Sequence, residues 1–163
     1  MKAIASKVRN CTSCPLHKTL DGCSPVPGKG SRTAKIMIVE MSPSKEAFLI
    51  GEPFSQIEKQ TLDKLTEGIP KASLYYTNLL KCPTKSTAWK YLKPCLNHFS
   101  SEYNYLTPKM IIAVGTPTKR LLDELMLNCA IPHIPSLFKI LNGSKQSMED
   151  CRENIMNLYK VFC

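Results

Sequence analysis

The chain has 163 residues, 43% of them hydrophobic and 21% charged, a composition that excludes a disordered polymer and leaves room for one core but not two full domains. Lysine and arginine outnumber the acids by 22 to 13, and the net charge of +9 favours a polyanionic partner, with a basic surface of no binding role as the alternative. No stretch approaches the roughly 18 to 20 apolar residues of a membrane span, and the first residues have no apolar core of the length that a secretory signal needs, so we expect none. We therefore expect a cytoplasmic protein without a membrane partner.

The segments alternate between strand and helix patterns after an opening arm, residues 1–33, which is rich in cysteine, proline and glycine. In chain order we expect a strand at 34–39, a helix at 56–68, a strand at 73–80, a helix at 91–105, a strand at 109–114, a helix from 116 to 127, a strand at 130–134, a loop at 135–143 and a helix at 145–159. This order predicts a single α/β domain over residues 1–163, with a central, mostly parallel sheet of four strands between two helical layers.

The stretch KIMIVEMSPSKEAFLIGEPF, residues 35–54, begins with an apolar strand. A loop broken by Pro43 follows, and the stretch ends in the segment GEPF, residues 51–54. Loops at the carboxyl ends of parallel strands are where many α/β proteins bind their ligands. We therefore expect a ligand site beside this loop.

Eight cysteines in a reducing compartment are not expected to form four disulfides. Cys11 and Cys14 form a CxxC pair in the arm, Cys82 follows the second predicted strand, and Cys95 lies in the next predicted helix. Four thiolates can close a tetrahedral metal site, although the spacing leaves zinc, an iron–sulfur cluster and ordinary thiols all open. The others lack a partner at ligand spacing and are expected to be core or surface thiols: Cys23, Cys129, Cys151 and Cys163.

The segments VPGKGSRTAKIMIVEMSP, GEPF and YYTNLLKCP, followed by Cys95, resemble the family 4 uracil-DNA glycosylases, the iron–sulfur branch of their superfamily. The resemblance runs from Cys11 to the final helix. It implies a four-iron, four-sulfur (4Fe–4S) cluster held by Cys11, Cys14, Cys82 and Cys95, and so favours iron–sulfur over zinc. It also implies a parallel sheet with helices on both faces, and the hydrolysis of the N-glycosidic bond of a flipped uracil or modified pyrimidine in DNA repair.

Two base-binding residues follow from the same resemblance. Phe54 in the GxPF motif matches the aromatic side chain on which the family stacks the extruded base, and stacking is worth roughly 1 to 3 kcal/mol. Asn78 in the TN pair matches the amide that contacts the O4 and N3–H of uracil with a donor and an acceptor side by side.

The catalytic positions depart from the family pattern. Met41 stands where the first loop of the family carries its acid, and Glu40 lies one residue early, where strand alternation is expected to aim it away from the pocket. Ile134 stands at the position of the family histidine, with His133 one residue before it. Losing one preorganised polar group typically costs roughly 10²- to 10³-fold in rate.

Two functional hypotheses therefore stay open. One is an atypical glycosylase, and the other is a catalytically inactive member that acts as a DNA-binding or protein-binding accessory factor in replication or repair. The expected partner is single- or double-stranded DNA, with a repair or replication protein as a second candidate, in a nucleoid or in the cytoplasm of an infected host if the protein is viral. Lysines around the cluster loop are candidate phosphate contacts: Lys81, Lys85, Lys90 and Lys93.

Overall fold

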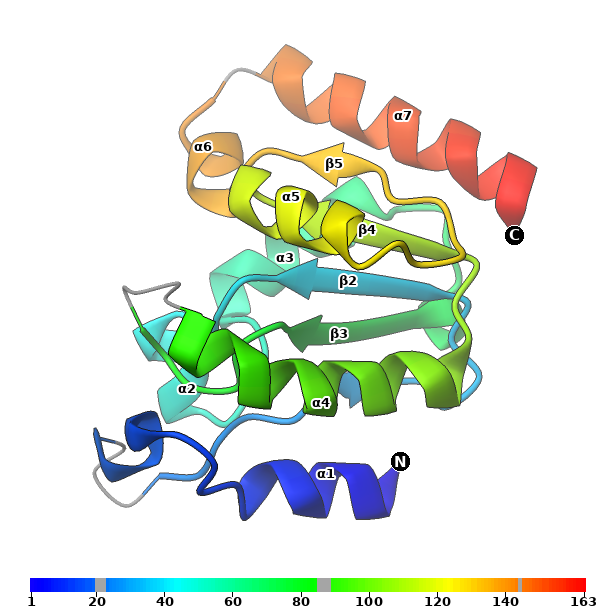
Figure 1. The fold of residues 1–163 in the computed structure, drawn as a ribbon. Coiled ribbons are helices and arrows are strands. Elements are labelled where there is room, and N and C mark those ends of the chain that lie inside the picture. The colour runs from blue at the N-terminus through cyan, green and yellow to red at the C-terminus, as the bar shows by residue number, and fades with distance from the viewer. Residues whose placement is uncertain (20–22, 85–88, 144) are drawn as a thin grey trace.

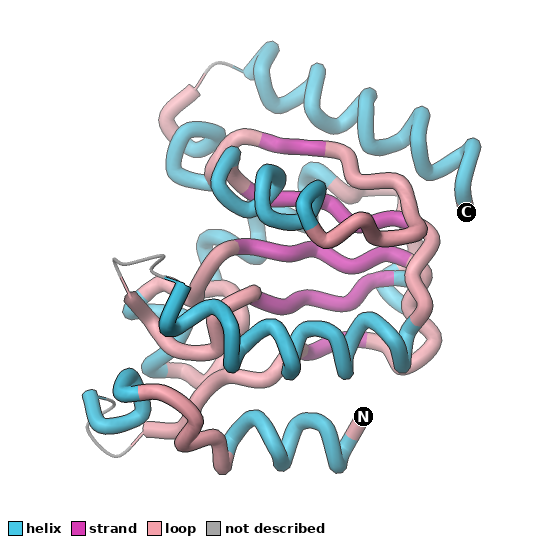
Figure 2. Tube along the Cα trace, viewed as in Figure 1, coloured by secondary structure: helices cyan, strands magenta, loops and turns pink. Residues whose placement is uncertain are grey.

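The computed structural model describes residues 1–19, 23–84, 89–143 and 145–163. In this part of the chain a five-stranded sheet runs through the middle of the molecule (Figure 2). The strands are β1 Lys29–Gly30, β2 Ile36–Glu40, β3 Leu74–Asn78, β4 Met110–Val114 and β5 His133–Ile134, in the order β1-β3-β2-β4-β5. Strands β3, β2, β4 and β5 are parallel, and only the short edge strand β1 pairs antiparallel. The predicted α/β fold is confirmed, with β1 as a strand that the sequence analysis did not include.

The helices of the described residues have the following bounds: α1 Lys2–Arg9, η1 Pro15–Thr19, α2 Lys45–Leu49, α3 Gln56–Leu65, η2 Lys71–Ser73, α4 Trp89–Leu106, α5 Thr116–Glu124, α6 Leu137–Leu141 and α7 Lys145–Phe162. The four predicted helices correspond to α3, α4, α5 and α7. No helix among the described residues has the length and apolar character that a bilayer span requires.

The central strands β2, β3 and β4 are buried on both faces almost throughout, which explains their largely apolar sequences. In β2, Ile36 and Ile38 pack into a core cluster with residues of α3, α6 and α7, whereas Met37 and Val39 pack on the opposite face with residues of α4 and α5. We call these the α3 face and the α4 face of the sheet. Helix α1 packs along the outside of α4 (Figure 1), burying Val8 completely.

One local prediction was wrong. The loop expected at 135–143 contains helix α6, because Leu137 and Ile140 lie three residues apart and bury one side of a short turn. In helix α3, 63% of the surface of Ile57 is exposed. At about 100° per residue, Ile57 lies about 140° around the helix from Leu62, which points into the core.

Candidate functional site

The carboxyl ends of the parallel strands meet at one edge of the sheet. Helices α2 and α6 and the first turns of α4 and α5 gather at the same edge (Figure 1). The last residues of β2 and β3, Glu40 and Asn78, are register partners, as are Val114 of β4 and Ile134 of β5. Because paired residues of parallel strands project from the same face, this edge brings a carboxyl group and an amide together on the α3 face.

The amide of Asn78 is buried without a hydrogen-bond partner. The residue is 1% exposed, and neither its Oδ1 nor its Nδ2 finds a partner among the described residues. An unsatisfied polar group in the interior costs about 1–3 kcal/mol, so it requires an explanation in terms of function or strain. A ligand that offers one acceptor and one donor side by side would satisfy both atoms.

Glu40 stands next to Asn78 and not on the far side of the sheet. The sequence analysis expected the one-residue offset to aim Glu40 away from the pocket, and this expectation was wrong, because the register aligns Glu40 with Asn78 itself. Burial, and secondarily the charge of Glu58, raises the pKa of Glu40 from 4.5 to about 8. The carboxyl group therefore keeps its proton at neutral pH.

The raised pKa of Glu40 makes folding stability depend on pH. Below pH 4.5 the carboxyl is protonated in both folded and unfolded chains, and as the pH rises towards 8 the unfolded chain ionises first, so this contribution to stability is lost. We expect Glu40→Gln, neutral at every pH, to flatten the decline and to be more stable than wild type by about 2–4 kcal/mol at alkaline pH. Urea unfolding across a pH series measures this. Glu46→Gln, at an exposed position of α2, is the control, and an unchanged slope in the Glu40 variant would contradict the assignment.

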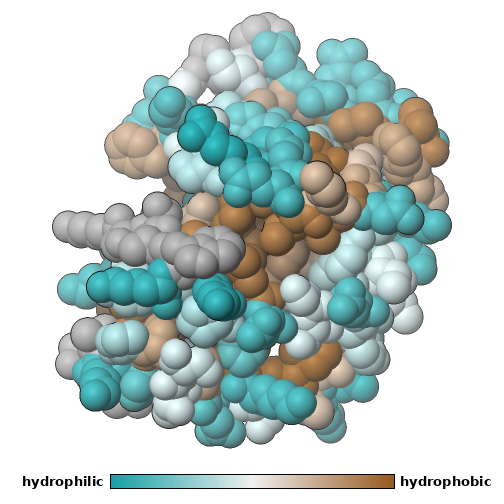
Figure 3. Space-filling model, in the orientation of Figure 1, coloured by the Kyte–Doolittle hydropathy of each residue, from teal (hydrophilic) through white to brown (hydrophobic). Residues whose placement is uncertain are grey.

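Met41 lies on the α4 face, away from Asn78. It packs against the core cluster of that face and lines a hollow of about 280 Å³ with Leu92 of α4 and with Pro117 and Arg120 of α5. The surface between α5 and α4 is visibly apolar on this side of the molecule (Figure 3). A thioether in this place has no proton to exchange, and Met41 does not face the buried amide.

Ile134 and His133 occupy opposite faces of the sheet. Ile134 belongs to the core cluster of the α3 face, the face of Asn78, whereas His133 pairs with Ala113, which packs on the α4 face. The Nε2 atom of His133 is buried and has no hydrogen-bond partner among the described residues. The residue on the side of the candidate pocket is thus an isoleucine, as the ungapped alignment indicated.

Phe54 lies on the same face as Asn78 but is enclosed. It is 3% exposed and packs edge-on against Tyr76, with ring centroids 6.1 Å apart and an interplanar angle of 74°. Lys59 of α3 stands over the outer part of Tyr76, with its Nζ 5.1 Å from the ring centroid. The two rings form an apolar wall, and a base would reach the face of Phe54 only after a local rearrangement.

The loop between β2 and α3 is fixed by one carboxylate. Glu58 Oε2 accepts hydrogen bonds from the Ser55 N–H at 2.6 Å and from the Ser44 hydroxyl at 3.2 Å. The first bond completes a capping box at the start of α3, and the second ties it to the N-cap of α2. These two bonds thereby fix the loop beside the strand ends.

The four predicted ligand cysteines come together between the arm and the start of α4. Cys82 and Cys95 are buried at 4% and 3% exposure, and Cys11 and Cys14 are half-buried. Burial raises the pKa of the Cys82 thiol to about 12, with further contributions from the charges of Cys95, Cys14 and Cys11. For Cys95 burial is again the largest cause of a raised pKa, partly offset by the backbone N–H of Lys81.

No three His, Cys, Asp or Glu side chains among the described residues are arranged to hold a metal ion. The thiols nevertheless interact through their charges, which act over longer distances than a metal–ligand bond. Tetrahedral zinc needs sulfurs within about 2.3 Å of one ion, whereas a cluster of several irons spans a wider gap between its thiolates. The donor set of four thiols, two of them buried, is compatible in its chemistry with either group.

The remaining cysteines have the environments expected from sequence. Cys23 packs against a small cluster formed by Leu16, Val26, Phe48 and Cys82. Cys129 and Cys151 are half-buried beside the two main cores, and Cys163 is exposed. The small cluster shows that the arm is held partly by apolar packing as well as by polar contacts.

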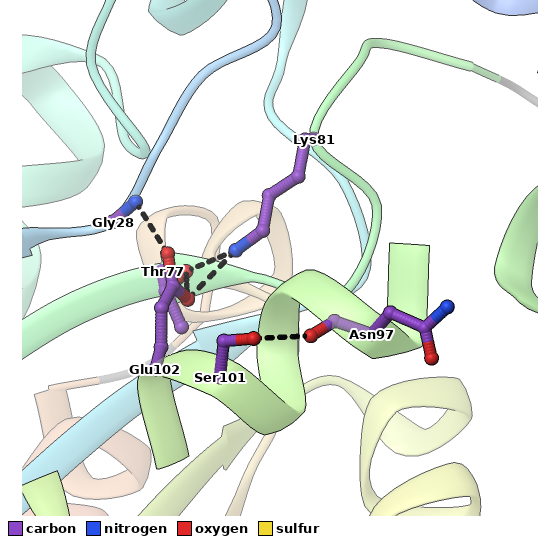
Figure 4. A network of polar contacts seen from close by, with 6 residues as sticks. All are labelled: Gly28, Thr77, Lys81, Asn97, Ser101 and Glu102. Atoms are coloured by element: carbon purple, nitrogen blue, oxygen red, sulfur yellow. Dashed lines mark hydrogen bonds and ion pairs between the residues drawn. The ribbon is translucent and has the colours of Figure 1, made fainter. Parts of the chain in front are cut away.

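A buried ion pair connects the arm, β3 and α4 (Figure 4). Lys81, 1% exposed, donates from Nζ to Glu102 Oε2 at 2.8 Å and to Thr77 Oγ1 at 2.7 Å. Thr77 donates to the same Glu102 oxygen at 2.6 Å, and the Gly28 N–H donates to the other at 2.9 Å. A Cβ at Gly28 would lie 2.5 Å from the Tyr75 ring, so only glycine allows the arm to approach this closely.

This network corrects one sequence expectation and reveals a missed feature. Lys81 was one of the candidate phosphate contacts, but its ammonium is enclosed within the protein. Lys90 and Lys93 are exposed on the first turns of α4, and Lys85 lies outside the described residues. Glu102 was overlooked because a lone acid in an amphipathic helix has no sequence feature that distinguishes it from a solvated one.

Phe138 was also missed. It is 77% exposed on α6, directly after the carboxyl end of β5, although its neighbours Leu137 and Ile140 are buried. The combination of a large apolar side chain with Lys139 beside it on an exposed turn was visible in the sequence, but the segment was expected to be a loop.

Comparisons with known proteins agree with this architecture. Residues 27–159 match the family model described as "Uracil DNA glycosylase superfamily". The chain is 32% identical over 126 residues to the type-4 uracil-DNA glycosylase of Pyrobaculum aerophilum, covering 73% of this chain and 62% of that protein. The type-4 uracil-DNA glycosylase of Thermotoga maritima is 29% identical over 71% of this chain and 62% of its own, and that of Archaeoglobus fulgidus is 27% identical over 69% and 58%. The chain thus spans about three fifths of the length of these relatives.

A solved structure supports the fold. The solution NMR structure of a candidate uracil DNA glycosylase from Methanosarcina acetivorans superposes with a TM-score of 0.63 at 13% identity, covering 83% of this chain and 97% of that one. This likeness concerns the fold. The match of the family model over residues 27–159 shows that the chain belongs to the uracil-DNA glycosylase superfamily, in which its sequence is similar to the type-4 members.

Proposed function

We propose that the protein binds DNA containing uracil or a related altered pyrimidine, takes the base out of the stack and hydrolyses its N-glycosidic bond slowly. The observation that carries this proposal is the buried amide of Asn78, whose donor and acceptor have no partner in the described protein. Such a group destabilises the free protein and becomes favourable once a base edge satisfies it. The names of the type-4 relatives support the choice of uracil.

DNA would approach the edge where the strands end. Lys90 and Lys93 are exposed on the first turns of α4, and the net charge of +9 favours contact with phosphates. Phe138 presents an exposed aromatic ring on α6, a type of side chain that stacks on bases or wedges between base steps. These groups would hold the backbone and the opened stack while one base enters the pocket.

Within the pocket, the amide of Asn78 would donate to O4 and accept from N3–H of the base, and the Phe54–Tyr76 wall would exclude water from one side. Cleavage builds negative charge on the departing base and positive charge on the sugar, so its rate depends on preorganised polar groups. Met41 and Ile134 provide none on this face. For this reason we expect slow turnover.

We further propose that Cys11, Cys14, Cys82 and Cys95 hold a 4Fe–4S cluster. When bound, the cluster would act as a structural clamp that joins the arm to the start of α4. The chain supports that clamp with its own bonds, because the Val26 N–H donates to the Lys81 carbonyl at 2.7 Å beside the ligand position of Cys82. The arm would thus be held on both sides of the thiols.

Single-turnover assays on uracil-containing single- and double-stranded oligonucleotides, with excess protein, test the proposed activity. An alkali-labile abasic product from the uracil strand, and none from a thymine strand, supports a glycosylase. The alternative of an inactive accessory factor also has support, because Met41 and Ile134 stand at the positions where the family carries its catalytic polar groups. That alternative is favoured by salt-sensitive DNA binding without any abasic product.

The cluster proposal makes a separate prediction. Purified without oxygen, the protein should be brown and contain about four irons per chain, and Cys82→Ser should lose the colour and most of the iron because one buried ligand is gone. Cys163→Ser, at an exposed cysteine, is the matched control and should keep both. Iron and zinc analysis with visible absorption measures the result. A wild-type protein that is colourless, carries stoichiometric zinc and is stably folded would disprove the cluster.

A further inference from the structure

Glu40 is placed to contact the same ligand as Asn78. The two residues end adjacent parallel strands in direct register, and neighbouring strands lie about 4.8 Å apart. This separation is comparable to the width of the polar edge of a pyrimidine. The β2–β3 pairing continues past both residues, since the Leu79 N–H donates to the Glu40 carbonyl at 2.9 Å and the Leu80 N–H to the Met41 carbonyl at 2.8 Å. The backbone that carries the two side chains is therefore fixed.

The surroundings of Glu40 favour the neutral acid. On α3, Glu58 adds a like charge, and Lys59 is placed over Tyr76. On β3 the neighbour is the uncharged Asn78, and the carboxyl ends of β4 and β5 contribute Val114 and Ile134 to this face.

Other charges near this face are satisfied elsewhere. Lys29 and Glu52, near the outer side of the Phe54–Tyr76 wall, form their own ion pair with 2.5 Å between Nζ and Oε1. No described residue forms an ion pair or side-chain hydrogen bond with the Glu40 carboxyl. Burial, followed by the charge of Glu58, raises the pKa of Glu40 to about 8.

We propose, building on the function proposed above, that Glu40 is a base-contacting residue that donates a hydrogen bond from its neutral carboxyl to the second carbonyl oxygen of the flipped pyrimidine. The polar edge of uracil runs acceptor, donor, acceptor. The amide of Asn78 complements the first two groups, and the O–H of Glu40 complements the third. An ionised Glu40 has no proton to donate and repels the carbonyl oxygen, so base recognition depends on the protonation of this one residue.

The same hydrogen bond supports departure of the base. Negative charge builds on the ring as the glycosidic bond breaks, and a donor already aimed at a carbonyl oxygen strengthens its hydrogen bond as that charge grows. Glu40 thereby provides a polar contact that neither Met41 nor Ile134 can make.

Two measurements test this role. In the free protein, carboxyl ¹³C chemical shifts of glutamate-labelled protein, assigned with Glu40→Gln, give the pKa of Glu40 without any DNA. In parallel, fluorescence anisotropy compares single strands that carry either 2′-fluorinated deoxyuridine, which resists cleavage, or a tetrahydrofuran abasic analogue at the same position. The ratio of the two affinities is taken as the uracil preference, because it reports the contacts made to the base itself. Both measurements use wild type, Glu40→Gln and the exposed control Glu46→Gln.

We expect Glu40 to titrate near 8 and the uracil preference of wild type to fall about tenfold as the pH rises through that value. Glu40→Gln should lose this pH dependence, and Glu46→Gln should retain it. A Glu40 pKa near 4.5, or a uracil preference that does not change with pH, would overturn the role of Glu40 and leave the proposed function standing. A protein that prefers uracil at no pH would overturn both.

Discussion

Replacing Asn78 with leucine should make the free protein more stable and remove its response to uracil. Leucine has the same number of side-chain heavy atoms as asparagine and no polar atom to desolvate, so it relieves two buried groups that have no partner among the described residues. We expect a gain of about 1–2 kcal/mol in the free energy of unfolding. The same change removes the donor and acceptor that would contact the base, and we expect single-turnover cleavage and uracil preference to fall by about 10²- to 10³-fold.

Urea unfolding and single-turnover kinetics measure the two effects on the same preparations. Asn78→Ala separates loss of the amide from obstruction by the larger leucine, because both variants should lose activity while only alanine leaves space. Asn104→Ala, at an exposed position in α4, should change stability by no more than about 0.5 kcal/mol and leave cleavage unchanged. A destabilised Asn78→Leu protein, or one that still discriminates uracil, would refute the role assigned to the amide.

Replacing Glu102 with glutamine should be among the most destabilising single changes in the chain. The substitution leaves the Lys81 ammonium, 1% exposed, without its carboxylate, and breaking one side of a buried pair typically costs about 3–5 kcal/mol. It also weakens the acceptor of the Gly28 N–H, which links the arm to α4. We therefore expect faster proteolysis of the arm as well as a lower midpoint of urea unfolding.

A double-mutant cycle separates the pair from its surroundings. Lys81→Met alone leaves a buried carboxylate, whereas Lys81→Met with Glu102→Gln removes both charges, so the double variant should be less destabilised than the sum of the single ones. The exposed pair Lys119–Asp123 on α5 is the matched control, and Asp123→Asn should cost no more than about 0.5 kcal/mol. If the changes in the free energy of unfolding of the two single variants are additive, the pair does not hold the arm. The same follows if Glu102→Gln unfolds within about 1 kcal/mol of wild type.

The fold was predictable because its main elements carry local patterns. Runs such as Ile36–Val39 and Met110–Val114 are apolar at every position, which only a strand buried on both faces explains in a chain of this length. Helix α6 was not predictable, because five residues between Ser136 and Asn142 give too short a window for a helical period. Helix α2, equally short, was missed for the same reason.

The candidate site was predictable by motif but not by geometry. The motifs selected Asn78 and the four cysteines as candidates, and their roles stay predictions. The sequence also predicted that Met41 and Ile134 stand where the family carries its catalytic polar groups. The alternation of side chains along β2 predicted the wrong face for Glu40, because it compares positions within one strand only. Which residues share a face with Asn78 is set by the register between β2 and β3. The burial of Lys81 was equally hidden, since an isolated lysine is ordinarily a solvated residue.

The amino-acid sequence by itself determined the order of the parallel strands and of helices α3, α4, α5 and α7, the superfamily, and which thiols and which amide are the candidates for the site, because these depend on local periodicity and on residues at fixed spacing. The tertiary structure alone decided which side chains share an environment. It placed Glu40 beside Asn78, Met41 on the opposite face, and Lys81 against Glu102, 21 residues along the chain. The reason is physical: burial and strand register are properties of packed segments distant in sequence, and they set both the protonation of a carboxyl group and the partner of a buried charge.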